Sequence, residues 1–316
     1  MDTLPEYANT ETTEMKERAE RLGRTIALAL LIAGGVGWTE PLRVLGQTTP
    51  APAVTPSVAP SPLAADPCGG ETRLLATLNR PTVGYSACAV APGTVVIEEG
   101  YQNQQGSSSN PSTLIQYPQS FTRIGVKERF EVDVIGPYFN RLAVPDGTGG
   151  LTRTSGYQDG GLGFKYEFVP TGRFVVGVDG LYTAPSGSRG FTSGGPSETA
   201  NLDVAYAVTP TFGIGTTLAF SSTSGFTAVG KQSGYNAFLP SGVLTAQLRD
   251  NYQLYAEYVY LSKLAPDQGG RAFVDYGVQH LLGKRFEIDL EQGLSITPDS
   301  NLKFSYIGFG FGVQFK

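Results

Sequence analysis

The stretch FEIDLEQGLSI, residues 286–296, alternates apolar and acidic side chains over its first six positions. The apolar set is Phe286, Ile288 and Leu290, and the acidic set is Glu287, Asp289 and Glu291. A period of two is the pattern of a β-strand with two different faces. A charge on the lipid face of a barrel costs up to about 2–4 kcal/mol at the bilayer midplane, acids somewhat less. If this strand crosses a membrane, its acids must therefore face an interior and its apolar residues must face lipid.

Similar segments recur along the chain from Gly93 to the end, and no convincing helix interrupts them. The clear ones are 130–134, 162–168, 174–180, 202–208, 212–220, 252–260, 273–279 and 286–296. Weaker ones fit around 94–101, 114–125 and 236–248, and the terminal FSYIGFGFGVQFK, 304–316, makes the twelfth. A tilted membrane strand needs about 9–11 residues, which this spacing accommodates.

The connections between these segments alternate in length. Short ones lie at 126–129, 169–173, 208–211, 248–251 and 282–285. Longer ones, rich in Gly, Ser and Pro, lie at 103–112, 145–156, 185–198, 222–234 and 264–270, while 297–301 is short. Outer-membrane barrels have tight periplasmic turns and longer outer loops, whereas a soluble sandwich has no reason to sort its loops. We therefore predict an all-β fold, an antiparallel up-and-down transmembrane β-barrel of about 12 strands.

The N-terminal region predicts export to the outer membrane of a Gram-negative-type bacterium. Basic residues precede an apolar run at 25–38 that is short and broken by glycine, as in a signal peptide. We assign 1–46 to the signal peptide region, with Met15 as the expected true start. A single anchoring helix at 25–41 is the alternative. Residues 47–67 are rich in Pro, Ala and Thr and predict an extended linker.

Two cysteines, Cys68 and Cys88, follow the linker. Because an exported chain enters an oxidising compartment, we expect them to form a disulfide, with two free small residues as the alternative. We propose that residues 68–92 form a periplasmic strap or partial plug, and that residues 93–316 form the barrel.

Three stretches carry a resemblance to a known family: 78–103, 117–134 and 160–187. Their motifs and the closing Gly/Phe-rich strand succeed one another as in the outer-membrane transporter family called MetA-pathway of phenol degradation, which residues 78–316 resemble. The resemblance implies movement of hydrophobic or aromatic compounds across the outer membrane. It implies neither catalytic residues nor a cofactor.

The alternation assigns a set of charged side chains to the interior, where they would line a pore. The set is Glu131, Asp133, Lys165, Glu167, Asp179, Asp203, Glu257, Asp275, Glu287, Asp289 and Glu291. One lysine among ten acids predicts an acidic lumen, which favours cations. The alternative is that these are wall residues that are solvated or hydrogen-bonded to one another.

Other classes of function are disfavoured by composition. A net charge of −5 without a basic stripe argues against a nucleic-acid partner. A single histidine, His280, excludes a histidine-based metal cluster, and two cysteines cannot make a four-thiolate site. His280 is expected at the membrane interface without an acid partner, so we do not expect an enzyme, and an outer-membrane hydrolase is the weakest alternative.

The terminal strand completes the expectation. Its alternate residues Ile307, Phe309, Phe311, Val313 and Phe315 would face lipid and form the strand read by the barrel assembly machinery. The glycines between them would leave interior space for a solute or for the strap. We therefore expect a monomeric outer-membrane channel for small molecules, with a structural or surface-interaction barrel of closed lumen as the alternative.

Overall fold

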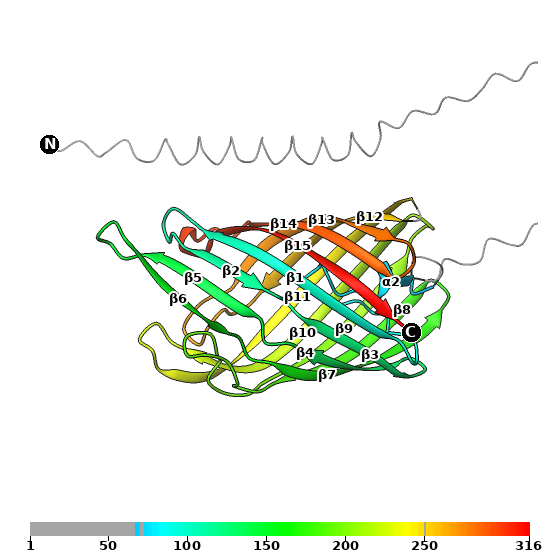
Figure 1. The fold of residues 1–316 in the computed structure, drawn as a ribbon, viewed down its shortest axis with the longest axis horizontal. Coiled ribbons are helices and arrows are strands. Elements are labelled where there is room, and N and C mark those ends of the chain that lie inside the picture. The colour runs from blue at the N-terminus through cyan, green and yellow to red at the C-terminus, as the bar shows by residue number, and fades with distance from the viewer. Residues whose placement is uncertain (1–66, 70–72, 250) are drawn as a thin grey trace, which may run out of the picture. The chain divides into compact units, whose positions relative to one another are not determined.

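The computed structural model describes residues 67–69, 73–249 and 251–316, and its strands form one 15-stranded antiparallel sheet that closes on itself (Figure 1). The strands are β1 (Val95–Gly106), β2 (Thr113–Tyr117), β3 (Phe121–Lys127), β4 (Phe130–Ile135), β5 (Phe139–Pro145), β6 (Leu151–Tyr157), β7 (Gly161–Thr171), β8 (Phe174–Thr183), β9 (Ser197–Ala207), β10 (Phe212–Phe226), β11 (Gln232–Arg249), β12 (Tyr252–Leu261), β13 (Arg271–Leu282), β14 (Phe286–Ser295) and β15 (Phe304–Phe315). Pairing of β15 with β1 along their whole lengths closes the barrel. Closure removes the unpaired strand edges that lipid could not satisfy.

Three crossings of the wall are each built from two strands. β1 pairs with β2 near one end and with β3 near the other, and β2 and β3 are separated by residues 118–120. Pro118 lies in this gap and has no N–H group to continue the ladder. β4 with β5, and β7 with β6, form the next two crossings in the same way. The barrel therefore has 12 crossings, and the predicted fold class is confirmed.

The prediction of a loop at 145–156 was wrong in part. Its second half forms β6, which pairs with β5 from Phe139 opposite Tyr157 to Pro145 opposite Leu151. Gly147 and Gly149 lie in the turn between the two strands, with positive φ values of 78° and 90°. The resulting hairpin extends beyond the neighbouring strands (Figure 1). Threonine and the alternation in this stretch favour a strand, but its glycine-rich start hides the pairing.

The short connections lie at one end of the barrel, together with the C-terminus (Figure 1). They join β3 to β4, β7 to β8, β9 to β10, β11 to β12 and β13 to β14. Short turns face the periplasm in outer-membrane barrels, so this is the periplasmic end. The predicted signal peptide region and the linker up to residue 66 lie outside the described residues. None of the described helices is long and apolar enough to cross a bilayer.

The two faces of the strands differ sharply in chemistry. Outward residues are large and apolar, such as Leu162, which is 60% exposed, and Phe309, which is 58% exposed. On β14, Leu290 is 50% exposed while the acids on either side of it are buried. The outer surface is therefore an apolar band suited to lipid, and the charged residues lie inside.

On the outer side, one carboxylate holds the long β8–β9 loop against the start of β7. Asp159 accepts hydrogen bonds from the backbone N–H of Gly187 at 2.7 Å and of Ser193 at 2.8 Å, and from the Ser193 hydroxyl at 2.6 Å. Burial works to raise the pKa of Asp159, but these hydrogen bonds outweigh it and the pKa is lowered. Asp159 therefore stays ionised and fixes the loop over the barrel mouth.

We predict that Leu290→Arg destabilises the barrel by about 2–4 kcal/mol, because a cation near the bilayer midplane must leave water. Leu290→Phe, which keeps an apolar residue at the same site, should change the stability little. Unfolding in lipid vesicles by urea, followed by the shift of the folded band in gels, measures both. Equal stability of the arginine variant and the wild-type protein would contradict the outward placement of this face.

Candidate functional site

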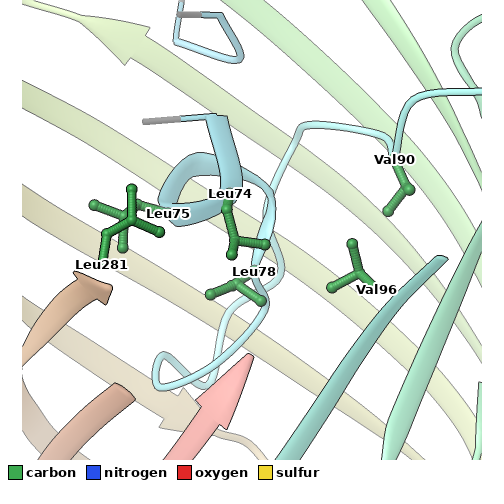
Figure 2. Packing of buried hydrophobic residues seen from close by; sticks show 6 residues of the cluster. All are labelled: Leu74, Leu75, Leu78, Val90, Val96 and Leu281. Atoms are coloured by element: carbon green, nitrogen blue, oxygen red, sulfur yellow. The ribbon is translucent and has the colours of Figure 1, made fainter. Parts of the chain in front are cut away.

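Residues 67–69 and 73–92, here called the inner segment, lie inside the barrel at its periplasmic half. The segment contains the short helix α2 (Arg73–Thr77), which carries Leu74 and Leu75, and Leu78 follows it; Leu75 lies beside Leu281 of the wall (Figure 2). The three leucines of the segment form a buried cluster with Val90, with Val96 on β1 and with Leu281 on β13. Burial of a leucine side chain contributes about 1.5–3 kcal/mol, so this cluster anchors the helix to the wall.

A disulfide closes the inner segment into a loop. Cys68 and Cys88 are bonded at an S–S distance of 1.99 Å with their Cα atoms 5.4 Å apart. The pair is buried against Ala87 and against Val175 on β8. The two ends of the segment are thereby held together at one place on the wall.

Backbone N–H groups in the middle of the segment donate to carboxylates of the wall. Glu98 on β1 accepts from Asn79 at 2.9 Å and from Arg80 at 2.8 Å. Glu257 on β12 accepts from Val83 at 2.7 Å and from Gly84 at 2.8 Å. Hydrogen bonds to a charged acceptor are about twice as strong as neutral ones. Each of these carboxylates therefore anchors two residues of the segment through their backbone N–H groups.

The end of the segment is held in the same way by β4 and β7. Ala89 donates its N–H to Glu167 on β7 at 2.8 Å, and Val90 donates its N–H to Glu131 on β4. Both wall residues belong to the set predicted to line a pore, with hydrogen-bonded wall residues as the alternative. In the structure both accept hydrogen bonds from the protein's own backbone.

Arg123 on β3 connects the two halves of the segment. Its guanidinium donates to Glu131 at 2.7 and 2.9 Å, to the carbonyl oxygen of Cys88 at 2.8 Å and to that of Thr77. The side chain is 0% exposed. The hydrogen-bonding capacity of this buried cation is therefore used. Its removal would leave two buried carbonyl oxygens without their donor and a buried carboxylate without its opposite charge.

Two further cations face the acids of the interior. Arg80, on the inner segment, lies 3.0 Å from Asp289 and 3.3 Å from Glu291. Lys165 on β7 lies 3.7 Å from Asp179 and 3.6 Å from Asp203, and donates to the carbonyl oxygen of Ser86. The wall acids are thus paired partly by cations and partly by the segment.

The structure places every charged residue assigned to the interior on the inner face. These residues, from 0% to 7% exposed, are Glu131, Asp133, Lys165, Glu167, Asp179, Asp203, Glu257, Asp275, Glu287, Asp289 and Glu291. Some of those away from the segment have other partners, whereas both carboxylate oxygens of Glu287 are buried without a hydrogen bond to any described residue. Asp275 accepts from the hydroxyls of Tyr255, at 2.6 Å, and of Tyr306, and Asp179 accepts from the Asn201 amide at 2.6 Å.

Sequence reasoning missed three charged residues that hold this site: Arg80, Glu98 and Arg123. Glu98 and Glu99 are adjacent, so the alternation did not tell which one faces inward. Arg123 lies in a strand that is broken before it, which obscured its parity. Arg80 lies in the segment ahead of the barrel, where a period of two gives no information.

The bare face of the terminal strand is filled by the inner segment. A Cβ atom at Gly310 would overlap the Arg80 guanidinium, and one at Gly312 would overlap Leu78. At Gly308 it would overlap Glu291. Here the glycines leave room for protein, and larger residues would displace the segment. On the other face Ile307, Phe309, Phe311 and Phe315 are exposed, and Val313 is partly buried.

Tyr85 lies at the centre of the segment. Its ring is 5.8 Å from that of Phe121 on β3, and the Lys165 ammonium is 5.5 Å from its centroid. Burial raises the pKa of the Tyr85 hydroxyl, and the charges of Asp179 and Asp133 raise it further. The side chain is therefore neutral at physiological pH and extends across the lumen as an amphipathic ring.

A cavity of about 230 Å³ remains between the inner segment and the wall. It lies at the periplasmic end beside β9, β10 and β11, and Gly213, Gly215 and Thr245 are among its lining residues. On the segment side it is lined by Ala76, Arg80 and Tyr85 among others. The interior is therefore filled unevenly.

His280 lies away from this site, on the outer face of β13. Its ring stacks on that of Tyr252 with centroids 4.0 Å apart, and Nδ1 lies 3.1 Å from the carbonyl oxygen of Asn251. Both contacts are near the periplasmic turn between β11 and β12. Within the described ranges, no group of three or more His, Cys, Asp and Glu side chains is placed to hold a metal ion.

No protein-family model matches this chain. A search of curated proteins also gives no match. Among solved structures, the COG4313 outer membrane channel from Pseudomonas putida F1 is similar with a TM-score of 0.58 and 12% identity, over 72% of this chain and 98% of that chain. The likeness to this channel shows that the two chains share a fold.

Two other barrels are less similar. The NanC porin has a TM-score of 0.45 and 12% identity, over 69% of this chain and 98% of its own. The CymD monoaromatic hydrocarbon channel has a TM-score of 0.39 and 10% identity, over 71% of this chain and 88% of its own. Together with the closed barrel and its apolar outer band, the fold shared with the COG4313 channel identifies an outer-membrane β-barrel.

We predict that Arg123→Gln loosens the inner segment by about 3–5 kcal/mol, because it leaves Glu131 as a buried charge without its cation. Hydrogen exchange of the full-length protein in detergent, read by mass spectrometry over residues 73–92, measures this loosening. Arg173→Gln, in the exposed β7–β8 turn, removes the same charge and should have no effect on that region. Unchanged protection in the Arg123 variant would contradict the role of this residue.

Proposed function

We propose that the protein is an outer-membrane channel through which small molecules pass passively, and that residues 68–92 act as its plug. The observation that carries the proposal is how the interior is filled. The wall contributes many small inward residues, and a separate N-terminal segment occupies the space that they leave. A purely structural barrel of this size would be packed by the side chains of its own wall.

The way in which the segment is held also supports a plug. Its middle and its end contact the wall through hydrogen bonds to Glu98, Glu257, Arg123 and Glu131. Water can replace such contacts when the segment moves, whereas a wholly apolar contact would have to be exposed. The COG4313 protein that shares the fold is described as an outer membrane channel, which agrees with this function.

The class of solute is proposed from the sequence resemblance. Residues 78–316 resemble the MetA-pathway of phenol degradation family, and we propose membership of that family and passage of hydrophobic or aromatic compounds. The lipid-facing terminal strand, from Ile307 to Phe315, is proposed as the strand that the barrel assembly machinery recognises.

The charges of the interior bear on selectivity in an unexpected way. With the segment seated, the acids at Glu98, Glu131, Glu167 and Glu257 accept hydrogen bonds from its backbone and do not face an open bore. We infer that cation preference belongs to the unplugged barrel, in which these carboxylates would line water.

A second candidate is a barrel with a permanently closed lumen that acts through its outer loops. The observation in its favour is that the inner segment is hydrogen-bonded to several separate strands of the barrel, among them β1, β3, β7 and β12. The two candidates differ in whether any solute crosses.

Solute flux in proteoliposomes tests the proposal. We compare the full chain with a variant lacking residues 68–92, using arabinose, lysine, glutamate and phenyl glucoside as solutes. Removal of the segment should raise flux by about tenfold or more and favour lysine over glutamate, because bore and lining charge set permeation. Absence of flux for every solute in both folded proteins would contradict the channel and support the closed barrel.

A further inference from the structure

The inner segment leaves one sector of the barrel free of ionic anchors. Its charged and charge-assisted contacts go to β1, β3, β4, β7, β12 and β14. Against β10 it exchanges hydrogen bonds with the hydroxyl of Thr217. The cavity of about 230 Å³ lies in this sector.

This sector also has an unusual lining. On β10 the inward residues from Gly213 to Thr223 are small, and on β11 those from Ser233 to Gln247 are small, apolar or polar without charge. No inward position in these two ranges, all of which the structure describes, carries a charged side chain. The neighbouring strands differ, since Asp203 on β9 and Glu257 on β12 face inward. An uncharged stripe therefore runs along the whole β10–β11 hairpin.

Residues 83–85 of the inner segment close this stripe at one level. Val83 and Gly84 are held by Glu257, and Tyr85 donates its N–H to Thr217 Oγ1 at 2.9 Å. A Cβ atom at Gly84 would overlap Ser241 Oγ, and it would lie 2.8 Å from Glu257 Oε1 and 3.0 Å from Thr217 Oγ1. The constriction is therefore between Gly84 and three side chains, the hydroxyls of Thr217 and Ser241 and the carboxylate of Glu257, which already accepts from Val83 and Gly84.

Ion pairs and the disulfide hold the segment on both sides of this constriction. Before it, Arg80 is paired with Asp289 and Glu291. After it, Arg123 and Glu131 hold residues 88–90, where the disulfide also attaches. Residues 83–85 carry no charge of their own and are held by backbone hydrogen bonds to Glu257 and Thr217, so a route past them requires only these three residues to move.

We propose that solute crosses the barrel along the uncharged β10–β11 stripe, past residues 83–85, and that this route selects small uncharged molecules. The inference rests on the proposed channel function and specifies its route and its solute class. Asp203 at the level of the constriction does not alter this, because its carboxylate accepts from Thr217 and lies 3.6 Å from Lys165.

Gly215 is the residue that tests the route. It lies on the wall of the cavity, and a Cβ atom there would be 3.0 Å from the Val243 side chain, a contact that a small shift relieves. Gly215→Phe therefore fills the cavity in the full chain. Gly242→Phe on the paired strand β11 is the matched control, because Gly242 is exposed on the lipid face and has open space around it.

Arabinose, lysine and glutamate flux into proteoliposomes is the readout. The wild-type protein should pass arabinose faster than either charged solute, and Gly215→Phe should reduce arabinose flux by about tenfold, since a narrower bore limits permeation. Gly242→Phe should behave as wild type. Thr245→Lys is a second variant on the cavity wall. It should raise the flux of glutamate relative to that of lysine, and it tests the route if the phenylalanine variant does not fold.

The outcomes separate the two proposals. If the wild-type protein and the variant lacking residues 68–92 pass no solute, the channel function fails and the route fails with it. If the wild-type protein conducts but Gly215→Phe, shown to be folded, conducts arabinose equally well, the channel stands and the route is overturned. An unchanged ratio of glutamate to lysine in Thr245→Lys would also overturn the route.

Discussion

The structure depends on one constraint, that carboxylates enclosed by a membrane barrel are costly unless they have partners, and most of those described here have them. A buried charge without a hydrogen bond or an opposite charge costs several kcal/mol. Here the acids cannot turn outward, because lipid would be worse, and the wall supplies few cations. The inner segment answers this constraint with backbone N–H groups and with Arg80, while Arg123 on the wall binds both the acids and the segment.

This constraint explains why an acidic interior and an N-terminal segment occur together. Without the segment, Glu98, Glu131, Glu167 and Glu257 would each lose the N–H donors that now satisfy them and would need water in their place. In the proposed channel these residues exchange a dry environment, paired with protein, for a hydrated one. A plug with two such states suits a channel better than a structural barrel, and the uncharged β10–β11 stripe is the part of the wall that does not take part in the exchange.

The barrel could be predicted from the sequence because the two patterns that indicate it, the alternation of side chains and the alternation of loop lengths, are local. Alternation decides the face of each residue, and on β14 it placed Glu287, Asp289 and Glu291 inward as the structure has them. The sorting of short and long connections gave the up-and-down order. Where the pattern is interrupted, at Pro118 or at the glycine-rich turn before β6, prediction lost the parity of Arg123 and the whole of the β5–β6 hairpin.

The interior could not be predicted in this way, because the segment that fills it has no periodicity. The glycines of β15 indicated space, and the sequence left open whether solute or protein occupies it; the contacts of Gly310 and Gly312 with Arg80 and Leu78 show that protein does. From the sequence, the acids resembled a cation-selective lining, because the N–H groups that donate to them lie far away in the chain. Glu257 and Val83, for example, are 174 positions apart.

The most direct test is to lock the segment to the wall in the full chain. A Cβ atom at Gly84 would touch the Ser241 side chain, so Gly84→Cys combined with Ser241→Cys places two thiols within bonding reach. If the segment controls a channel, oxidation of the double variant should abolish arabinose flux in proteoliposomes, while each single variant under the same oxidation continues to conduct. Flux that is the same with and without the cross-link would contradict the account.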